Sequence, residues 1–196
     1  MFEMEILLAL GIGIGLSSVA GVRAFLPLAL AALFAQLGFF SPPITYADPG
    51  GWLTVVSVLA GLAVVEILLD KIPALDRPFS YVMVPVRIAS GAVLFAAALG
   101  MNLAPESAPW LVAGGVIAGV VAVAKVLLRP PAKAASAGVS PAFLSFSEDV
   151  VGLVGGAIGF FVPYLPLLLV AFLLYFYYRV RRRRGRKYGG LRILGD

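Results

Sequence analysis

Residues 52–69 read WLTVVSVLAGLAVVEILL, an apolar run of 18 residues whose only charge is Glu66. An α-helix rises about 1.5 Å per residue, so this run reaches about 27 Å, close to the roughly 30 Å hydrocarbon core of a bilayer. Residues 110–128, WLVAGGVIAGVVAVAKVLL, form a second run of this kind with one lysine. Both stretches predict helices that cross a membrane.

The composition of the whole chain matches these two runs. Of its 196 residues, 61% are hydrophobic and 13% are charged, whereas a soluble domain is about a quarter charged. The chain has no histidine and no cysteine. Their absence excludes disulfide scaffolds, thiol enzymes, Ser-His-Asp triads and zinc or haem sites built on His or Cys ligands. The composition therefore indicates an integral membrane protein.

The remaining apolar segments set the number of helices. Residues 6–40 would reach about 52 Å as one helix, so two helices that turn near Gly21–Arg23 fit better. Residues 79–100 form one span, and residues 143–178 form two helices that turn near Phe161–Leu165. The sequence predicts an all-α, polytopic transmembrane bundle of about seven hydrophobic helices. Its terminal hairpins either cross the membrane fully or re-enter it.

The positions of the basic residues predict the orientation. Cytoplasmic loops carry an excess of Lys and Arg. With the C-terminus inside, one side holds Arg23, Lys71, Arg77, Arg129, Lys133 and the basic residues of 179–192, and the other holds only the acidic Glu3, Glu5, Asp48 and Glu106. We expect a multi-pass protein of the inner (plasma) membrane with the N-terminus outside and the C-terminus in the cytoplasm. The acidic N-terminus disfavours a cleaved signal peptide.

An internal repeat is also visible. Residues 52–74 align without gaps on residues 110–132, with nine identities that include both tryptophans. The alignment predicts a duplicated two-helix unit, residues 52–100 and 110–161, inside a single transmembrane domain of residues 1–180. Repeats of this kind recur in transporters, with binding sites at the repeat interface. Duplication of a purely structural hairpin would leave the same pattern.

Seven charges are predicted to lie in or beside the cytoplasmic half of the membrane: Arg23, Glu66, Asp70, Arg87, Lys125, Glu148 and Asp149. A charge at a helix centre costs roughly 2.5–3.5 kcal/mol on insertion scales, so these groups should pair or face water. We expect Arg87 and Glu148 to form a buried pair. Lys125, Asp70 and Arg129 are expected near the interface. Ser145 and Ser147 are candidate helix caps.

Two functions fit these charges. The first is a small transporter or channel-like protein whose cytoplasm-facing site binds an ion or small polar solute, with candidate binding residues Arg23, Glu66, Asp70, Arg87, Glu148 and Asp149. The alternative is a non-transporting scaffold, assembly factor or lipid-binding protein in which the same charges hold helices together. We expect no catalytic residue, no metal and no cofactor, and therefore no enzyme. Lipid-modifying chemistry on a carboxylate-bound Mg²⁺ remains a distant third function.

Small residues and the basic tail predict the partners. Pairs of glycines four residues apart are typical of close helix packing and leave homo-oligomerisation open: Gly11/Gly15, Gly115/Gly119, Gly152/Gly156 and Gly155/Gly159. Ser17 and Ser18 either line a broken-helix ion site or bond back to their own helix. Residues 181–196 form a basic cytoplasmic tail, which orients the chain and binds anionic lipid headgroups of the bilayer. No nucleic acid is indicated.

Several short motifs carry a resemblance to a known family. They are GVRAFLP at residues 21–27, Glu66 followed by DKIP at residues 70–73 with Asp76, and Pro141 followed by Ser145, Glu148 and Asp149. Over roughly residues 10–175 the chain resembles small bacterial membrane proteins catalogued as domain of unknown function 4126. The resemblance implies a helical membrane fold and marks these charges, but it implies no activity. Members tend to have a His before the lysine that matches Lys125 and an Asn where this chain has Ser140.

Overall fold

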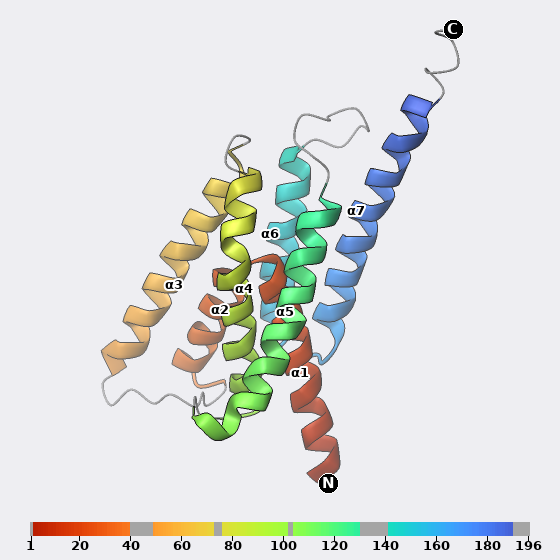
Figure 1. The fold of residues 1–196 in the computed structure, drawn as a ribbon. Helices are drawn as coiled ribbons and strands as arrows, with labels where there is room; N and C mark the ends of the chain where they lie inside the picture. Colours follow the sequence, from red (N-terminus) through yellow and green to blue (C-terminus); the bar gives the residue numbers. More distant parts are fainter. Residues whose placement is uncertain (1, 40–48, 73–75, 102–103, 130–140, 190–196) are drawn as a thin grey trace, which may run out of the picture.

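The computed structural model describes residues 2–39, 49–72, 76–101, 104–129 and 141–189, and within these ranges it is helical, with no strand (Figure 1). It confirms the all-α class and the expected helix number. The seven α-helices are α1 (Phe2–Val22), α2 (Phe25–Gln36), α3 (Pro49–Asp70), α4 (Asp76–Ala98), α5 (Ala108–Leu128), α6 (Pro141–Ile158) and α7 (Leu165–Gly189), and a 3-10 turn, Pro105–Ser107, precedes α5.

The helix boundaries follow the predicted ones closely. Both terminal hairpins turn where the sequence predicts, since α1 ends at Val22 and α7 begins at Leu165. The main difference is at the C-terminal end, where α7 continues past Tyr178 to Gly189. Arginine is a good helix former, so the basic segment extends the last helix instead of ending it.

Within the described residues, four helices are long and apolar enough to cross a membrane. Their outward faces carry large apolar side chains, such as Leu53, Val82 and Val112, that are more than half exposed. A surface of this kind matches lipid rather than water. The described helices are those of a membrane-embedded protein. The four segments are Met4–Val22, Gly51–Asp70, Pro78–Ala98 and Pro105–Leu128.

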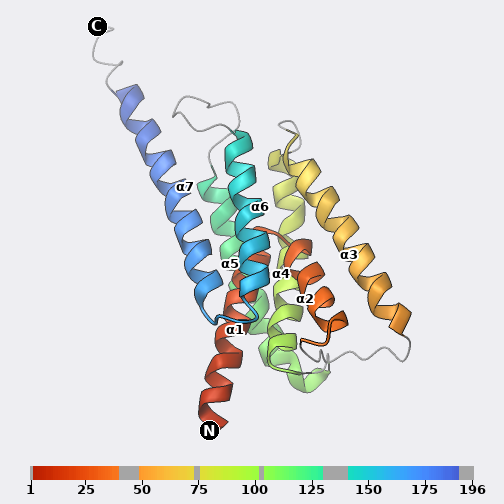
Figure 2. The same cartoon turned by 180° about the vertical axis from the view of Figure 1, so that it is seen from behind.

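Helix α1 lies inside the bundle from about Gly11 onward, where it contacts α4, α5, α6 and α7, while residues 4–8 are exposed. Helix α3 lies at the edge, packed mainly against α2, as Figures 1 and 2 both show. Its buried residues include the stripe Ala63, Glu66 and Asp70, while most of its other side chains point outward. Residues three and four apart share a helix face, so α3 meets the bundle through one small residue and two carboxylates.

The turn between α1 and α2 lies at mid-height in the bundle rather than at its end (Figures 1 and 2). Helix α2 has 12 residues and reaches about 18 Å, less than the thickness of the hydrocarbon core. Val22, Arg23 and Ala24 at this turn are all fully buried. The break in the helix therefore exposes backbone groups inside the protein, where they need partners.

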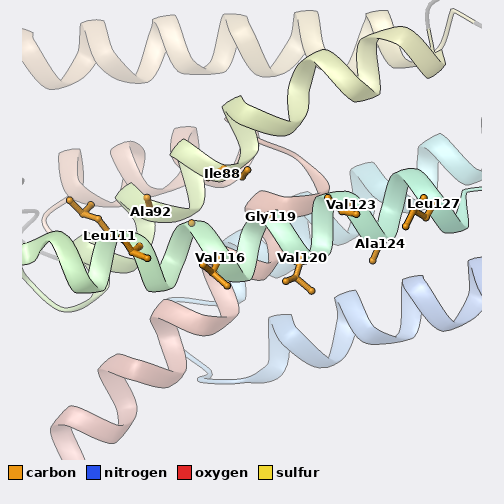
Figure 3. A pocket seen from close by; sticks show the side chains of 11 residues that line it. Ile88, Ala92, Leu111, Val116, Gly119, Val120, Val123, Ala124 and Leu127 are labelled. Carbon is orange, nitrogen blue, oxygen red and sulfur yellow. The ribbon is translucent and has the colours of Figure 1, made fainter.

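An apolar groove runs along the outer side of α5 where it packs against α4 (Figure 3). Its volume is about 820 Å³, and Ile88, Ala92, Leu111, Val116 and Val120 are among the apolar side chains that line it. Gly115 and Gly119 form its floor, where Ile88 lies against both. In a bilayer this surface matches acyl chains.

Glycine packing between helices is confirmed. A Cβ atom added at Gly15 would lie 3.2 Å from Pro166 of α7, and one at Gly155 would lie 2.8 Å from Val19 of α1. The Gly155 contact leaves no room for a larger side chain, and the Gly15 contact would require Pro166 to shift by a few tenths of an ångström. The glycine pairs of α1 and α6 therefore let these helices approach their neighbours closely.

We expect Gly91→Ala to lower the unfolding free energy by about 1–3 kcal/mol, the usual cost of overpacking. The added Cβ would lie 2.9 Å from the Gly114 carbonyl oxygen and would collide with the Ala118 Cβ. Gly61→Ala is the matched control, because no atom lies within 4 Å of its added Cβ. Detergent-titration unfolding of both variants checks this, and equal stabilities would contradict it.

Candidate functional site

Nine charged side chains meet where the α1–α2 turn approaches the end of α3, the end of α5 and the start of α6. We call this group the charge cluster. All six candidate binding residues belong to it. Its members are Arg23, Glu66, Asp70, Lys71, Arg87, Lys125, Arg129, Glu148 and Asp149. Six of the nine are almost completely buried, and Lys71, Arg129 and Asp149 form its more accessible edge.

The sequence of each helix explains why its charge points inward. On α5, Lys125 follows Gly114, Ala118 and Ala122 on the buried face. On α6, Glu148 lies one turn before Gly152, whose surface contacts the Arg23 side chain. Small residues mark the face along which a membrane helix packs. A charge on that face is therefore carried into the bundle.

Arg23 is the centre of the acidic side of the cluster. Its Nη2 lies 2.9 Å from Asp70 Oδ2, 2.6 Å from Asp149 Oδ1 and 3.5 Å from Glu148 Oε2. Asp149 also pairs with Lys71 at 2.7 Å. Arg23 therefore links the α1–α2 turn to α3 and α6 through three carboxylates.

Glu148 contacts two further basic residues, Lys125 and Arg129. Its Oε2 lies 2.8 Å from Lys125 Nζ and 3.4 Å from Arg129 Nη1, and the Tyr177 hydroxyl donates to Oε1 at 2.6 Å. Arg129 also binds Asp70 at 3.0 Å. Hydrogen bonds that involve an ionised partner are stronger than neutral ones, so this carboxylate connects α5, α6 and α7.

The two ends of the broken helix meet opposite charges. At the start of α2, the backbone N–H groups of Ala24 and Phe25 donate to the Glu66 carboxylate at 3.1–3.2 Å. At the end of α1, the Val22 carbonyl oxygen accepts a hydrogen bond of 2.9 Å from Lys125 Nζ. A helix N-terminus favours an anion and a C-terminus favours a cation. Both side chains therefore satisfy the backbone that the break exposes.

Arg87 is held differently from the other basic residues. Its side chain is fully buried, and Nη2 lies 3.5 Å from Glu66 Oε1. That contact is an ion pair without a hydrogen bond, and Nε, Nη1 and Nη2 all lack an acceptor among the described residues. Buried donors normally have a partner, so the N–H groups of this guanidinium remain available to donate to a ligand.

Two serines join α1 and its turn to α4, and a third bonds within α1. The Ser17 hydroxyl donates to the Gly91 carbonyl of α4 at 2.9 Å, and Ser90 donates to the Ala24 carbonyl at 2.7 Å. Ser18 bonds back to the Gly15 carbonyl three residues earlier. The back-bonding alternative therefore holds for Ser18, while Ser17 fixes α1 against α4.

Some expected interactions were wrong. Arg87 pairs with Glu66 of α3 rather than with Glu148, because Glu148 is occupied by Arg23, Lys125 and Arg129. Lys125 is fully buried and Asp70 is 3% exposed, so neither extends to the interface as expected. The two candidate caps, Ser145 and Ser147, lie inside α6, which begins at Pro141; Ser145 contacts Arg23 and Asp70, and Ser147 donates to the Leu144 carbonyl.

Tyr177 belongs to a group of tyrosines with Tyr175 and Tyr178, next to the basic segment, where interfacial aromatic residues are expected. The structure buries it completely, while the other two tyrosines are about half exposed. Its position on the stripe Val170, Leu173, Tyr177 and Val180 follows the helical spacing. That spacing is the sequence signal that could have predicted a buried Tyr177 and exposed Tyr175 and Tyr178.

Where side chains are described, no group of three His, Cys, Asp or Glu residues is arranged to hold a metal ion. Each acidic residue of the cluster instead contacts at least one basic residue. The side chain of Asp76 and the whole of Asp48 and Lys133 lie outside the described residues.

The comparison with protein families identifies the relatives of this architecture. A family model described as domain of unknown function (DUF4126) matches residues 10–183. The chain belongs to this family. The match spans the whole charge cluster, both terminal hairpins and the start of the basic tail. Searches of curated proteins and of solved structures found no match to this DUF4126 protein.

Proposed function

We propose that this DUF4126 protein is a small transporter or channel-like protein that moves an ion or small polar solute through the charge cluster. One observation carries the proposal, namely the helix break inside the bundle whose two ends contact Glu66 and Lys125. In several transporter folds, broken helices point their ends at the substrate and the coupling ions near the bilayer midplane.

The charged side chains in this break stand where ions bind in such proteins. Lys125 Nζ lies against the C-terminal end of α1, as a bound cation would, and the Glu66 carboxylate lies against the N-terminal end of α2, as a bound anion would. An ion that competes with either side chain would release one end of the break. Exchange of partners at this point gives the protein two alternative arrangements, which transport requires.

We propose that the protein lies in a bacterial inner membrane, with its N-terminus outside the cell and its C-terminus in the cytoplasm. The α1–α2 hairpin then re-enters the membrane from outside, since α2 is too short to cross. Arg181 at the start of the basic segment donates to the Leu127 carbonyl at the end of α5. This contact keeps the tail on the side of the charge cluster, where anionic headgroups bind it.

A specific observation favours the second candidate, a non-transporting scaffold or assembly factor. The cluster is tightly paired, with ion contacts of 2.6–2.9 Å for Arg23, Lys71 and Lys125. In a scaffold these pairs would only hold helices together. The two functions differ in what a charge substitution changes, which is flux in one case and stability in the other.

Glu66→Gln is expected to abolish flux while the protein still folds. The amide keeps one oxygen to accept the α2 N–H groups, but it removes the only ion partner found for Arg87 among the described residues. Purified protein in liposomes would be tested by solid-supported-membrane electrophysiology with steps of pH, sodium, chloride and formate. Circular dichroism and the unfolding midpoint would be measured on the same samples.

Lys71→Gln is the matched control, because it removes a charge at the exposed edge of the cluster. It should retain flux. Absence of any current or pH change with wild-type protein across these ions would overturn the transport proposal. A wild-type current that Glu66→Gln leaves intact would mean that the transport site lies elsewhere. A loss of stability in Glu66→Gln, without any flux through wild-type protein, would support the scaffold.

A further inference from the structure

The surroundings of Arg87 leave its positive charge under-compensated. Glu66, its nearest acid, is 3.5 Å away and already accepts the N–H groups of Ala24 and Phe25. Both oxygens of this carboxylate are therefore committed to the N-terminus of α2. An arginine carries five N–H donors, and those of Arg87 have no acceptor among the described residues.

A second positive charge lies near the first. The Lys125 ammonium is close enough to the Arg87 guanidinium for the two charges to repel each other. Lys125 in turn is committed to Glu148 and to the Val22 carbonyl. Two buried cations that repel each other and share no carboxylate favour an anion nearby.

We propose that Arg87 binds a small monovalent oxyanion, with a planar carboxylate or nitrate as the best fit. A guanidinium presents two parallel N–H groups to the two oxygens of such an anion. The anion has to be small, because the neighbouring stretch of α4 is packed against α5 so closely that Gly91 leaves no room for a Cβ next to Ala118. Binding stands on this geometry alone, and only the anion's role as the transported solute rests on the proposed function.

Ser80 marks the route toward this site. Its hydroxyl is buried and has no partner among the described residues. It precedes Arg87 by seven residues, or two helical turns, so both lie on the same face of α4. On this proposal, the anion passes this hydroxyl on the way from the start of α4 to the guanidinium.

The test uses the full-length protein in detergent, with sodium formate or nitrate replacing sodium gluconate at constant ionic strength. Gluconate is a much bulkier carboxylate, which we expect the close packing of α4 against α5 at Gly91 to exclude. A ligand that binds only the folded state raises Tm with its concentration, by about 4 °C at about ten times Kd. We expect this rise for wild type. Arg87→Gln should abolish it, and Ser80→Ala should raise the apparent Kd.

Lys71→Gln is again the matched control, because it removes one positive charge from the same cluster without touching Arg87. It should respond to formate as wild type does. Equal Tm values of wild type in formate and gluconate would overturn the proposal, even if Arg87→Gln did not fold. A response shared by Arg87→Gln and Lys71→Gln would overturn it as well. Formate binding without flux leaves this site intact and contradicts only transport.

Discussion

Arg23→Gln is expected to lower the unfolding free energy by about 3–5 kcal/mol, the usual cost of removing one partner from a buried ion pair. Arg23 contacts Asp70, Glu148 and Asp149 with one nitrogen, and its side chain is fully buried. Glutamine is shorter and neutral, so the three carboxylates would remain close together without the positive charge that compensates their repulsion. Unfolding by denaturing detergent in mixed micelles measures the change.

The control for this prediction is Lys71→Gln, which removes a positive charge from the same acidic group. Lys71 is 42% exposed and bonds only to Asp149 among the cluster acids described. An exposed pair of this kind contributes about 0–1 kcal/mol. Comparable losses for the two variants would mean that Arg23 is solvated in the membrane, contrary to its burial.

The second large effect is expected for Lys125→Met, which should also lower the unfolding free energy by about 3–5 kcal/mol. The substitution leaves the Val22 carbonyl at the helix break without its donor and removes the shortest ion contact of Glu148. Methionine fills a similar volume, so packing changes little. The loss therefore reports charge and hydrogen bonding rather than a cavity.

A double-mutant cycle with Glu148→Gln separates these two contributions. If the pair interacts as the 2.8 Å contact implies, the double variant should be more stable than the sum of the single losses predicts, with a coupling of about 1–3 kcal/mol. The residual loss belongs to the Val22 carbonyl. Additive losses would mean that Lys125 acts on the helix end alone and that Arg23, Arg129 and Tyr177 suffice for Glu148.

Hydropathy and length were enough to predict the helices. A run of 35 apolar residues is too long for one crossing, which placed the first turn near Arg23, and the similar length of residues 143–178 required the second. These arguments depend only on the rise of a helix and the thickness of a bilayer. They do not fix depth, so the position of the α1–α2 turn at mid-height became known only from the structure.

The charges were predicted to gather, but their partners were not. The topology placed Arg23, Glu66, Asp70 and Glu148 on the same side of the membrane. Charges inside a bilayer have to compensate one another, so these residues were expected to lie close together. Partner choice depends on how each helix is rotated and where it lies in the bundle. Lys125 was predicted at the interface, which is wrong, although Gly114 and Ala118 on the same helix face were a signal that could have placed it inward. The internal repeat stays a prediction.

The way α3 is held also bears on how the protein is made. Synthesis begins at the N-terminus, so α1 and α2 are in the membrane when α3 leaves the translocon. The partners of Glu66 at Ala24 and Phe25, and the Arg23 partner of Asp70, are then already present. Arg87 and Arg129 arrive later. The first three helices therefore form an early assembly unit in which a segment with two acidic residues is retained by the hairpin that precedes it.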